Sequence, residues 1–297
     1  MIRLGLCCLF IGEPIHFRRT TAKHQAKFSR KNQLRNLAAL CLHNAQELQR
    51  ALMYCRDAGI GAFRVNSQIL PLMTHPSQGY AIDELPGSND IIDLFRHCGD
   101  FARRFDIRTS FHPDQFVVIA SPKSEVRKKS VAELLYQSMV AGWIGADVIN
   151  LHAGGAYGDK VSSLKRMASA IRSLPPPIRS RLTLENDDRI FSPIDLLPVC
   201  RETGVPLVYD VHHHRCLPDG MSVFQATVEA LSTWNREPLF HISSPLERER
   251  TPVDRRHADT IDAEDFPAAW RSLDLTVDIE AKAKEIAVEK LRKDLVL

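Results

Sequence analysis

The sequence predicts a single (β/α)₈ TIM barrel formed by residues 1–297 as one domain, and three observations support it. Short apolar or β-branched runs alternate with longer amphipathic segments, and this alternation repeats eight times along the chain. Repeated strand–helix–strand units favour parallel strands, and eight of them fit a closed barrel of about 250 residues. No linker rich in glycine or serine divides the 297 residues. An open, doubly wound sheet is the alternative architecture.

The elements follow one another in a regular order, each strand being followed by a helix. The expected strands span residues 3–9, 61–65, 107–111, 147–151, 181–184, 206–209, 239–242 and 276–279. The expected helices span residues 33–57, 90–105, 125–145, 160–173, 193–203, 222–235, 263–272 and 281–294. Gly59 and Gly204 follow two of these helices, where a residue tolerant of positive φ ends the last turn. Ser192 followed by Pro193 begins another.

Composition places the chain among soluble globular proteins, with 44% hydrophobic and 25% charged residues. No apolar run approaches the roughly 18 residues of a membrane-spanning helix. Residues 4–11 imitate a short secretory signal, but Arg18 and Arg19 follow them without a small-residue cleavage site. The seven cysteines form no CxxC pair and are expected to be reduced thiols. We therefore expect a cytoplasmic protein.

The net charge of +3 is small, but its distribution is uneven. No acidic residue occurs between Pro14 and Gln46. The segment is suited to lie along a phosphate backbone, although a solvated loop and helix start explain the charge equally well. Its basic residues are Arg18, Arg19, Lys23, Lys27, Arg30, Lys31 and Arg35.

Six of the eight expected strands end on a residue type that binds metals. In a parallel barrel these ends meet at one mouth, where barrel enzymes place their chemistry. Mixed imidazoles and carboxylates suit borderline ions such as manganese, zinc or iron, and three crowded carboxylates would resist ionisation without cations to compensate them. We therefore predict a cluster of divalent ions. The strand-end residues are His112, His152, Glu185, Asp210, His241 and Glu280.

Further candidates surround these ends. If the strand before it continues, the run 210–214 cannot direct all three of its histidines at one ion, because side chains alternate along a strand. One or two of them are expected to bind. His257, in the loop after the seventh strand, is placed to reach the same mouth. Residues 152–158 carry glycines whose amides are suited to approach a phosphate, but they match neither a dinucleotide motif nor a P-loop.

An ordered set of six motifs, covering nearly the whole chain, resembles the UV damage endonuclease family. The motifs are Phe111-His-Pro-Asp-Gln-Phe116, Leu151-His-Ala-Gly-Gly-Ala-Tyr-Gly158, Thr183-Leu-Glu-Asn-Asp-Asp188, Asp210-Val-His-His213, His241-Ile-Ser-Ser-Pro245 and Ile279-Glu-Ala-Lys282. Members of that family are barrels, generally associated with manganese, that nick DNA 5′ to pyrimidine dimers and some other lesions.

The resemblance implies roles for individual residues. The six strand-end residues would be catalytic and would hold the central metals, with Glu185 bridging two of them. His213 and His257 would bind a third ion. Gln115 and Phe116 would enter the duplex beside the lesion, because an amide can replace lost base-pair hydrogen bonds and an aromatic ring can replace lost stacking. From the charge pattern, and not from the resemblance, the basic residues from Arg18 to Arg35, among them Arg19 and Lys23, would neutralise flanking phosphates together with Lys123, Arg127 and Lys128.

Several positions depart from the family pattern. Gln68 stands where some members have a metal-binding histidine, and Leu239 stands where members commonly have a lysine. Leu6 and Cys7 replace polar or aromatic residues after the first strand, and Phe116 lacks the hydroxyl group of the tyrosine in some relatives. These changes leave the principal metal ligands in place, but they bear on the rate, the lesion range and the third ion.

The resulting hypothesis is metal-dependent hydrolysis of a phosphodiester in damaged double-stranded DNA, by a monomer with two or three ions, most simply Mn²⁺, and no nucleotide cofactor. Ions about 3.5 to 4 Å apart would hold the scissile phosphate. We expect the protein to associate with the nucleoid during repair. Two rivals are a sugar isomerase or epimerase on a related metal-binding barrel, and a lesion-binding protein that does not cleave, which Leu239 suggests.

Overall fold

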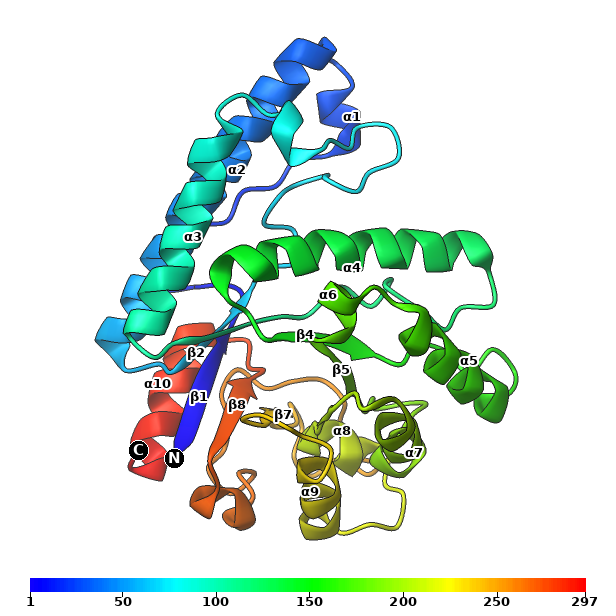
Figure 1. Ribbon diagram of the computed structural model, residues 1–297. Coiled ribbons are helices and arrows are strands. Elements are labelled where there is room, and N and C mark those ends of the chain that lie inside the picture. Colours follow the sequence, from blue (N-terminus) through cyan, green and yellow to red (C-terminus); the bar gives the residue numbers. More distant parts are fainter.

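The computed structural model describes residues 1–297, and eight parallel strands form its centre (Figure 1). The strands occur in the order β6-β5-β4-β3-β2-β1-β8-β7. A parallel bridge between Asp210 and His241 joins the two outer strands, and the amide of His241 donates to the carbonyl of Tyr209 at 3.0 Å. The sheet therefore closes, and the predicted barrel is confirmed over the open sheet.

The strands are short and buried, as parallel barrel strands must be because helices cover their outer face. They are β1 (Ile2–Cys7), β2 (Ala62–Val65), β3 (Arg108–Phe111), β4 (Val148–His152), β5 (Leu182–Glu185), β6 (Leu207–Val208), β7 (Leu239–Ile242) and β8 (Leu275–Ile279). All eight lie within or close to the predicted ranges.

The helices follow the strands, with several short additions. The α-helices are α1 (Ala22–Gln25), α2 (Arg30–Ala58), α3 (Ser88–Arg104), α4 (Ser124–Ile144), α5 (Lys160–Ser173), α6 (Pro176–Arg179), α7 (Pro193–Thr203), α8 (Val211–Cys216), α9 (Val223–Leu231) and α10 (Lys284–Leu295). The 3₁₀ turns are η1 (Ile82–Glu84) and η2 (Ala268–Ser272). None of the helices is long and apolar enough to cross a membrane.

The predicted helix ends have the expected chemistry. Gly59 and Gly204 end α2 and α7 with φ of 69° and 71°, values that a residue without a Cβ adopts at little cost. Ser192 and Asp195 form a capping box at the start of α7. All seven cysteines are free thiols, as expected.

Two sequence predictions of local structure were wrong. The helix expected at 263–272 is only the turn η2, because Pro267 has no amide hydrogen to donate and disfavours helical backbone at the residue before it. The run 211–214 is the helix α8 rather than an extended segment. Asp210 causes this, because its side chain accepts a hydrogen bond from the amide of His213 at 2.7 Å and caps the first turn.

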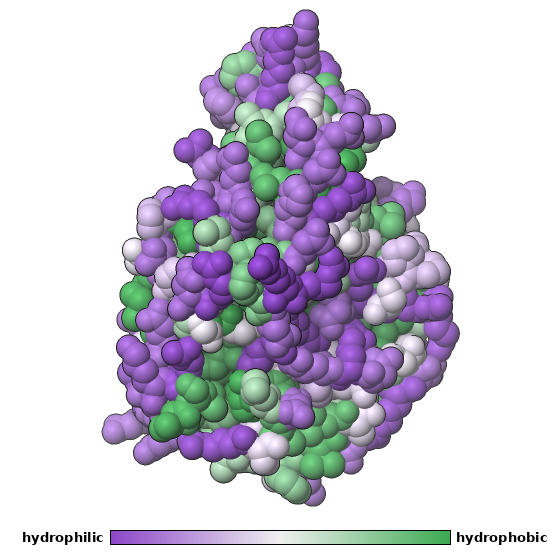
Figure 2. Space-filling model, turned by 60° about the vertical axis from the view of Figure 1, so that its left-hand side comes forward, coloured by the Kyte–Doolittle hydropathy of each residue, from purple (hydrophilic) through white to green (hydrophobic).

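Helices α2 and α3 extend beyond the barrel and form a projection at the top of Figure 1, together with α1. The corresponding upper part of the surface in Figure 2 is mostly hydrophilic. All seven basic residues of the acid-free segment are exposed. The fold thus presents the basic segment to solvent.

Candidate metal centre and nucleic-acid interface

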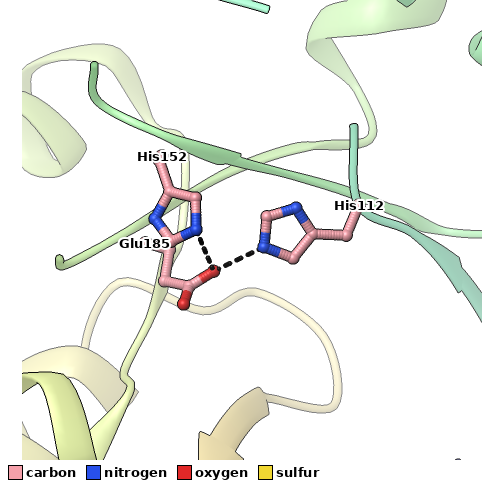
Figure 3. Close-up of side chains that lie close together, drawn as sticks. All are labelled: His112, His152 and Glu185. Carbon is pink, nitrogen blue, oxygen red and sulfur yellow. Dashed lines mark hydrogen bonds and ion pairs between the residues drawn. The ribbon is translucent and has the colours of Figure 1, made fainter. Parts of the chain in front are cut away.

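Glu185 is the centre of the cluster at the carboxyl ends of the strands. Its side chain is fully buried at the end of β5. Its Oε2 accepts from Nε2 of His112 at 2.9 Å and lies 3.9 Å from Nε2 of His152 (Figure 3). Its Oε1 lies 3.3 Å from Nδ1 of His213 and also 3.3 Å from Nδ1 of His241. One carboxylate therefore faces four imidazoles that come from four different strand ends.

The other two strand-end carboxylates lie in the same cluster. Oδ2 of Asp210, which is buried, lies 3.6 Å from Nδ1 of His213. Oε1 of Glu280 lies 3.3 Å from Nδ1 of His241. Three overlapping groups each have ligand atoms within 4.8 Å of one another, and they share members: His112, His152 and Glu185; His112, His241 and Glu280; Glu185, Asp210 and His213.

The donor set has the composition of a metal site, and its bonding is incomplete without one. Five buried atoms of these residues lack any hydrogen-bond partner: Nδ1 of His152, Oε1 of Glu185, Oδ2 of Asp210 and both ring nitrogens of His241, of which Nδ1 faces the cluster. Buried polar atoms are normally paired, so orphaned atoms on converging ligand residues fit a cation held between them. Imidazole nitrogen and carboxylate oxygen together suit manganese, zinc or iron.

Electrostatics within the cluster are governed by its own charges. Burial would raise the pKa of Glu185, but the imidazoles of His152 and His241 hold it well below its usual range. Burial lowers the pKa of His152. For His241, burial is outweighed by Glu185 and Glu280, which raise the pKa to about 9. The pKa of His213 is also raised well above its usual value, chiefly by Asp210 and Glu185 against the effect of burial.

The remaining predicted ligand, His257, lies at the edge of the cluster. Its Nδ1 is 3.9 Å from Oε2 of Glu280 and 3.3 Å from Oγ of Ser243, and its ring is 6.2 Å from that of His213. It joins none of the three tight groups. The predicted pairing of His213 and His257 around a third ion stays a prediction, since His213 lies closer to Glu185 and Asp210.

Helix α8 separates the roles of its three histidines. His213 faces the cluster. Nδ1 of His214 instead forms a 2.8 Å hydrogen bond with the hydroxyl group of Tyr209, and its Nε2 forms a 2.9 Å hydrogen bond with Oδ1 of Asp219. This side chain therefore supports the fold. The ring of His212 lies 5.5 Å from that of His257 and contributes no ligand atom to the three groups.

Two residues that donate hydrogen bonds to the cluster's carboxylates were missed from the sequence. Asn150, one pleat before His152 on β4, donates to Oε2 of Glu185 at 2.5 Å. Arg64 on β2 donates to Oε1 of Glu280 at 2.5 Å. Both face the barrel interior, so the period of two along a strand is the signal that could have identified them.

The predicted DNA contacts are exposed, apart from Arg127. Gln115 and Phe116 lie on the loop after β3, and Phe116 is 79% exposed although it is large and apolar. Arg18, Arg19, Lys23 and Lys123 are exposed and make no ion pair within the chain. Arg127, by contrast, is partly buried and donates to the carbonyls of Ser121 and Pro122.

Side chains of helix α2 form hydrogen bonds with the backbone at the start of the basic segment. The side chain of Asn44 accepts from the amide of Arg18 at 2.7 Å and donates to its carbonyl at 2.9 Å. Glu47 accepts from the amide of His16 at 2.7 Å. The backbone at 16–18 is thus fixed while the side chains of Arg18 and Arg19 stay exposed to solvent.

The structure shows what each residue that departs from the family pattern contacts. Nε2 of Gln68 donates to Asp114 at 3.2 Å, which ties the loops after β2 and β3 together. Leu239 is buried in a small apolar cluster with Val148 and Val208. Leu6 and Cys7 are both buried in β1. None of these side chains belongs to the three tight groups of ligand atoms.

Fold and site together define a parallel (β/α)₈ barrel with a candidate metal centre at its carboxyl-terminal mouth. The chain belongs to the UV-endonuclease UvdE family, whose model matches residues 2–297. A protein named UV DNA damage endonuclease from Bacillus velezensis (strain DSM 23117 / BGSC 10A6 / LMG 26770 / FZB42) is 34% identical over 304 residues, which cover 97% of this chain and 91% of the relative. The family predicted from the motifs is confirmed.

Solved structures agree with the fold. The crystal structure of SacUVDE is similar with a TM-score of 0.88 and 28% identity, and the match covers 100% of this chain and 98% of the other. D-psicose 3-epimerase from Clostridium cellulolyticum H10 is similar with a TM-score of 0.58 and 10% identity, over 99% and 96% of the two chains. The second likeness is one of fold alone.

Proposed function

We propose that this chain is a metal-dependent DNA repair endonuclease that nicks the backbone 5′ to ultraviolet photoproducts, above all pyrimidine dimers. Its cofactor would be two or three divalent ions, most simply Mn²⁺, and its substrate damaged double-stranded DNA. It would act as a single-domain monomer in the cytoplasm, associated with the nucleoid during repair, without a nucleotide cofactor. Membership in the UV-endonuclease family supports the repair activity.

One cavity carries the proposal. It measures about 540 Å³ and combines residues of both expected functions. Its lining includes three candidate metal ligands and three candidate DNA contacts: His112, His152, Glu280, Arg19, Gln115 and Phe116. A scissile phosphate in this cavity would therefore meet the ligand cluster while the adjacent nucleotides meet the exposed amide and ring.

The chain's residues divide the work. His112, His152, Glu185, Asp210, His213, His241 and Glu280 would hold the ions, with His257 at the edge. Divalent ions there would supply Lewis-acid stabilisation of the scissile phosphate and activation of the attacking water. Asn150 orients the Glu185 carboxylate through its 2.5 Å hydrogen bond, and Arg64 places a positive charge beside Glu280.

Selection of damage would depend on the duplex as much as on the protein. A dimer stacks and pairs poorly, so extruding it costs less than extruding intact bases. Phe116 would replace lost stacking, and Gln115 would occupy the lost pairing positions. The exposed basic segment would contact phosphates on either side and stabilise the bent duplex.

The decisive experiment uses supercoiled plasmid, ultraviolet-irradiated or untreated, with Mn²⁺ or with a chelator. We expect nicking only of irradiated DNA and only with metal. A duplex with one defined dimer then locates the cut, which should lie immediately 5′ to the lesion. The Glu185→Gln variant controls for contaminating nucleases and should not nick.

The same experiment tests the rivals. Binding of irradiated DNA without nicking would favour the lesion-binding alternative, for which Leu239 is the relevant departure. Turnover of a ketose without DNA binding or nicking would favour an epimerase on the same fold. Either result would overturn the endonuclease.

A further inference from the structure

Asp278 is a buried carboxylate that neither the predicted ligand set nor the proposed chemistry uses. It lies on β8 in register with His241 of β7 and is 1% exposed. Neither of its oxygens has a hydrogen-bond partner. Burying a carboxylate without a hydrogen-bond partner costs free energy, so we expect a hydrogen-bond donor close to Asp278.

His241 is the one cationic side chain with a nitrogen within 4.0 Å of Asp278. The distance from its Nε2 to Oδ2 of Asp278 is 3.7 Å, and no lysine or arginine nitrogen comes as close. On its other side, Nδ1 of His241 lies 3.3 Å from Oε1 of Glu185 and 3.3 Å from Oε1 of Glu280. The ring therefore connects the ligand cluster, through Nδ1, with Asp278, through Nε2.

We propose that Asp278 is a positioning residue. Its carboxylate accepts a hydrogen bond from the Nε2–H group of His241 and so directs Nδ1 of that ring at the metal centre. This inference rests on the proposed metal centre. An imidazole that binds a metal through one nitrogen usually donates its other N–H group to a carboxylate or carbonyl, which fixes both tautomer and ring orientation. Asp278 is the acceptor that the barrel interior offers at that place.

Gly5 is independent evidence for the placement of this carboxylate, because the space beside its Cα is filled by the side chain of Asp278. It pairs directly with Asp278 across β1 and β8. A Cβ atom at position 5 would clash with Oδ1 of Asp278. Glycine weakens a strand interior, and one use of it is to admit another group closely. Gly5 and Asp278 are therefore expected to act as a pair.

The test uses Zn²⁺, a diamagnetic probe of the metal centre, and two readouts other than activity. Calorimetry measures the Zn²⁺ dissociation constant, and ¹⁵N–¹H spectra of the histidine rings report which nitrogen is bound and which is protonated. The His241→Gln spectrum assigns the signals. In the unaltered, Zn²⁺-loaded protein we expect Nδ1 of His241 to be bound and Nε2 to carry a proton protected from exchange.

Three variants then separate the contributions. Asp278→Ala should weaken Zn²⁺ binding about 10- to 100-fold and mix the tautomers of His241. Asp278→Asn keeps an acceptor oxygen and should retain the tautomer with a smaller loss. Gly5→Ala should behave like Asp278→Ala, because it displaces the carboxylate. Asp147→Asn, at a carboxylate paired with Arg108 instead, is the matched control and should bind as the unaltered protein does.

The outcomes are distinct. Zn²⁺ bound through Nε2 of His241 in the unaltered protein would overturn the inference without any variant, as would Asp278→Ala with unchanged affinity and spectrum. Both results leave the metal centre standing. Failure of the unaltered protein to bind Zn²⁺ or Mn²⁺ would overturn the metal centre and this inference with it.

Discussion

Phe116 offers the cleanest separation of DNA recognition from folding and metal binding. Its ring is 79% exposed, so Phe116→Ala removes little buried area and should change the free energy of unfolding by no more than about 0.5 kcal/mol. Stacking of a base on an aromatic ring contributes about 1 to 3 kcal/mol. Since about 1.4 kcal/mol is a factor of ten, the variant should lose about 5- to 150-fold in affinity for damaged duplex.

Fluorescence anisotropy with a duplex that carries one dimer measures this loss. The control is Phe224→Ala, which removes the same side chain from a 63% exposed position on α9. We expect the control to bind damaged duplex normally and both variants to bind metal normally. Affinity of Phe116→Ala within twofold of the unaltered protein, or an equal loss in Phe224→Ala, would refute a stacking role for the ring.

Three further predictions concern the metal centre and the basic segment. Glu185→Gln removes the carboxylate that two ligand groups share, so it should abolish nicking and weaken metal binding at least about 100-fold while damaged-duplex binding persists; loss of both bindings would indicate misfolding instead. Because the pKa of His241 is about 9 in the metal-free protein, loading must displace its proton, and metal affinity should rise with pH up to about 9, with proton release measurable by calorimetry in buffers of different ionisation enthalpy. A pH-independent affinity would contradict that ligand role. Arg19→Ala should reduce the log–log salt slope of DNA binding by about 0.9, and an unchanged slope would remove Arg19 from the phosphate contacts.

The barrel could be predicted from the sequence because each strand carries its own signal of apolar and β-branched residues between turn residues. This pattern does not predict over how many residues each strand keeps regular backbone pairing. The regular strand β6 has only two residues, Leu207–Val208, although 206–209 was expected and the carbonyls of Pro206 and Tyr209 still accept from amides of the neighbouring strands. The helix expected at 263–272 failed for a local reason, since Pro267 interrupts a sequence that is otherwise suited to helix.

The convergence of the predicted ligand residues could be predicted because the barrel topology determines it. Closure of parallel strands brings their carboxyl ends together, whatever the separation in sequence, so His112 meets Glu185 across 73 positions. The supporting layer could not be predicted in the same way. Two of its residues, Asn150 and Asp278, stand two positions before a strand-end ligand, and Arg64 lies on a strand that carries no ligand. Their roles depend on contacts with Glu185, His241 and Glu280, which the sequence does not show.

The carboxylates of the barrel interior need compensating charge whether or not a metal is bound. Four buried or nearly buried carboxylates share this interior: Glu185, Asp210, Asp278 and Glu280. Arg64 forms an ion pair with Glu280, the neighbouring carboxylates raise the pKa of His213 and of His241, and burial raises the pKa of Asp278. Each of these shifts reduces the negative charge of the interior, so metal binding at the cluster would have to displace protons.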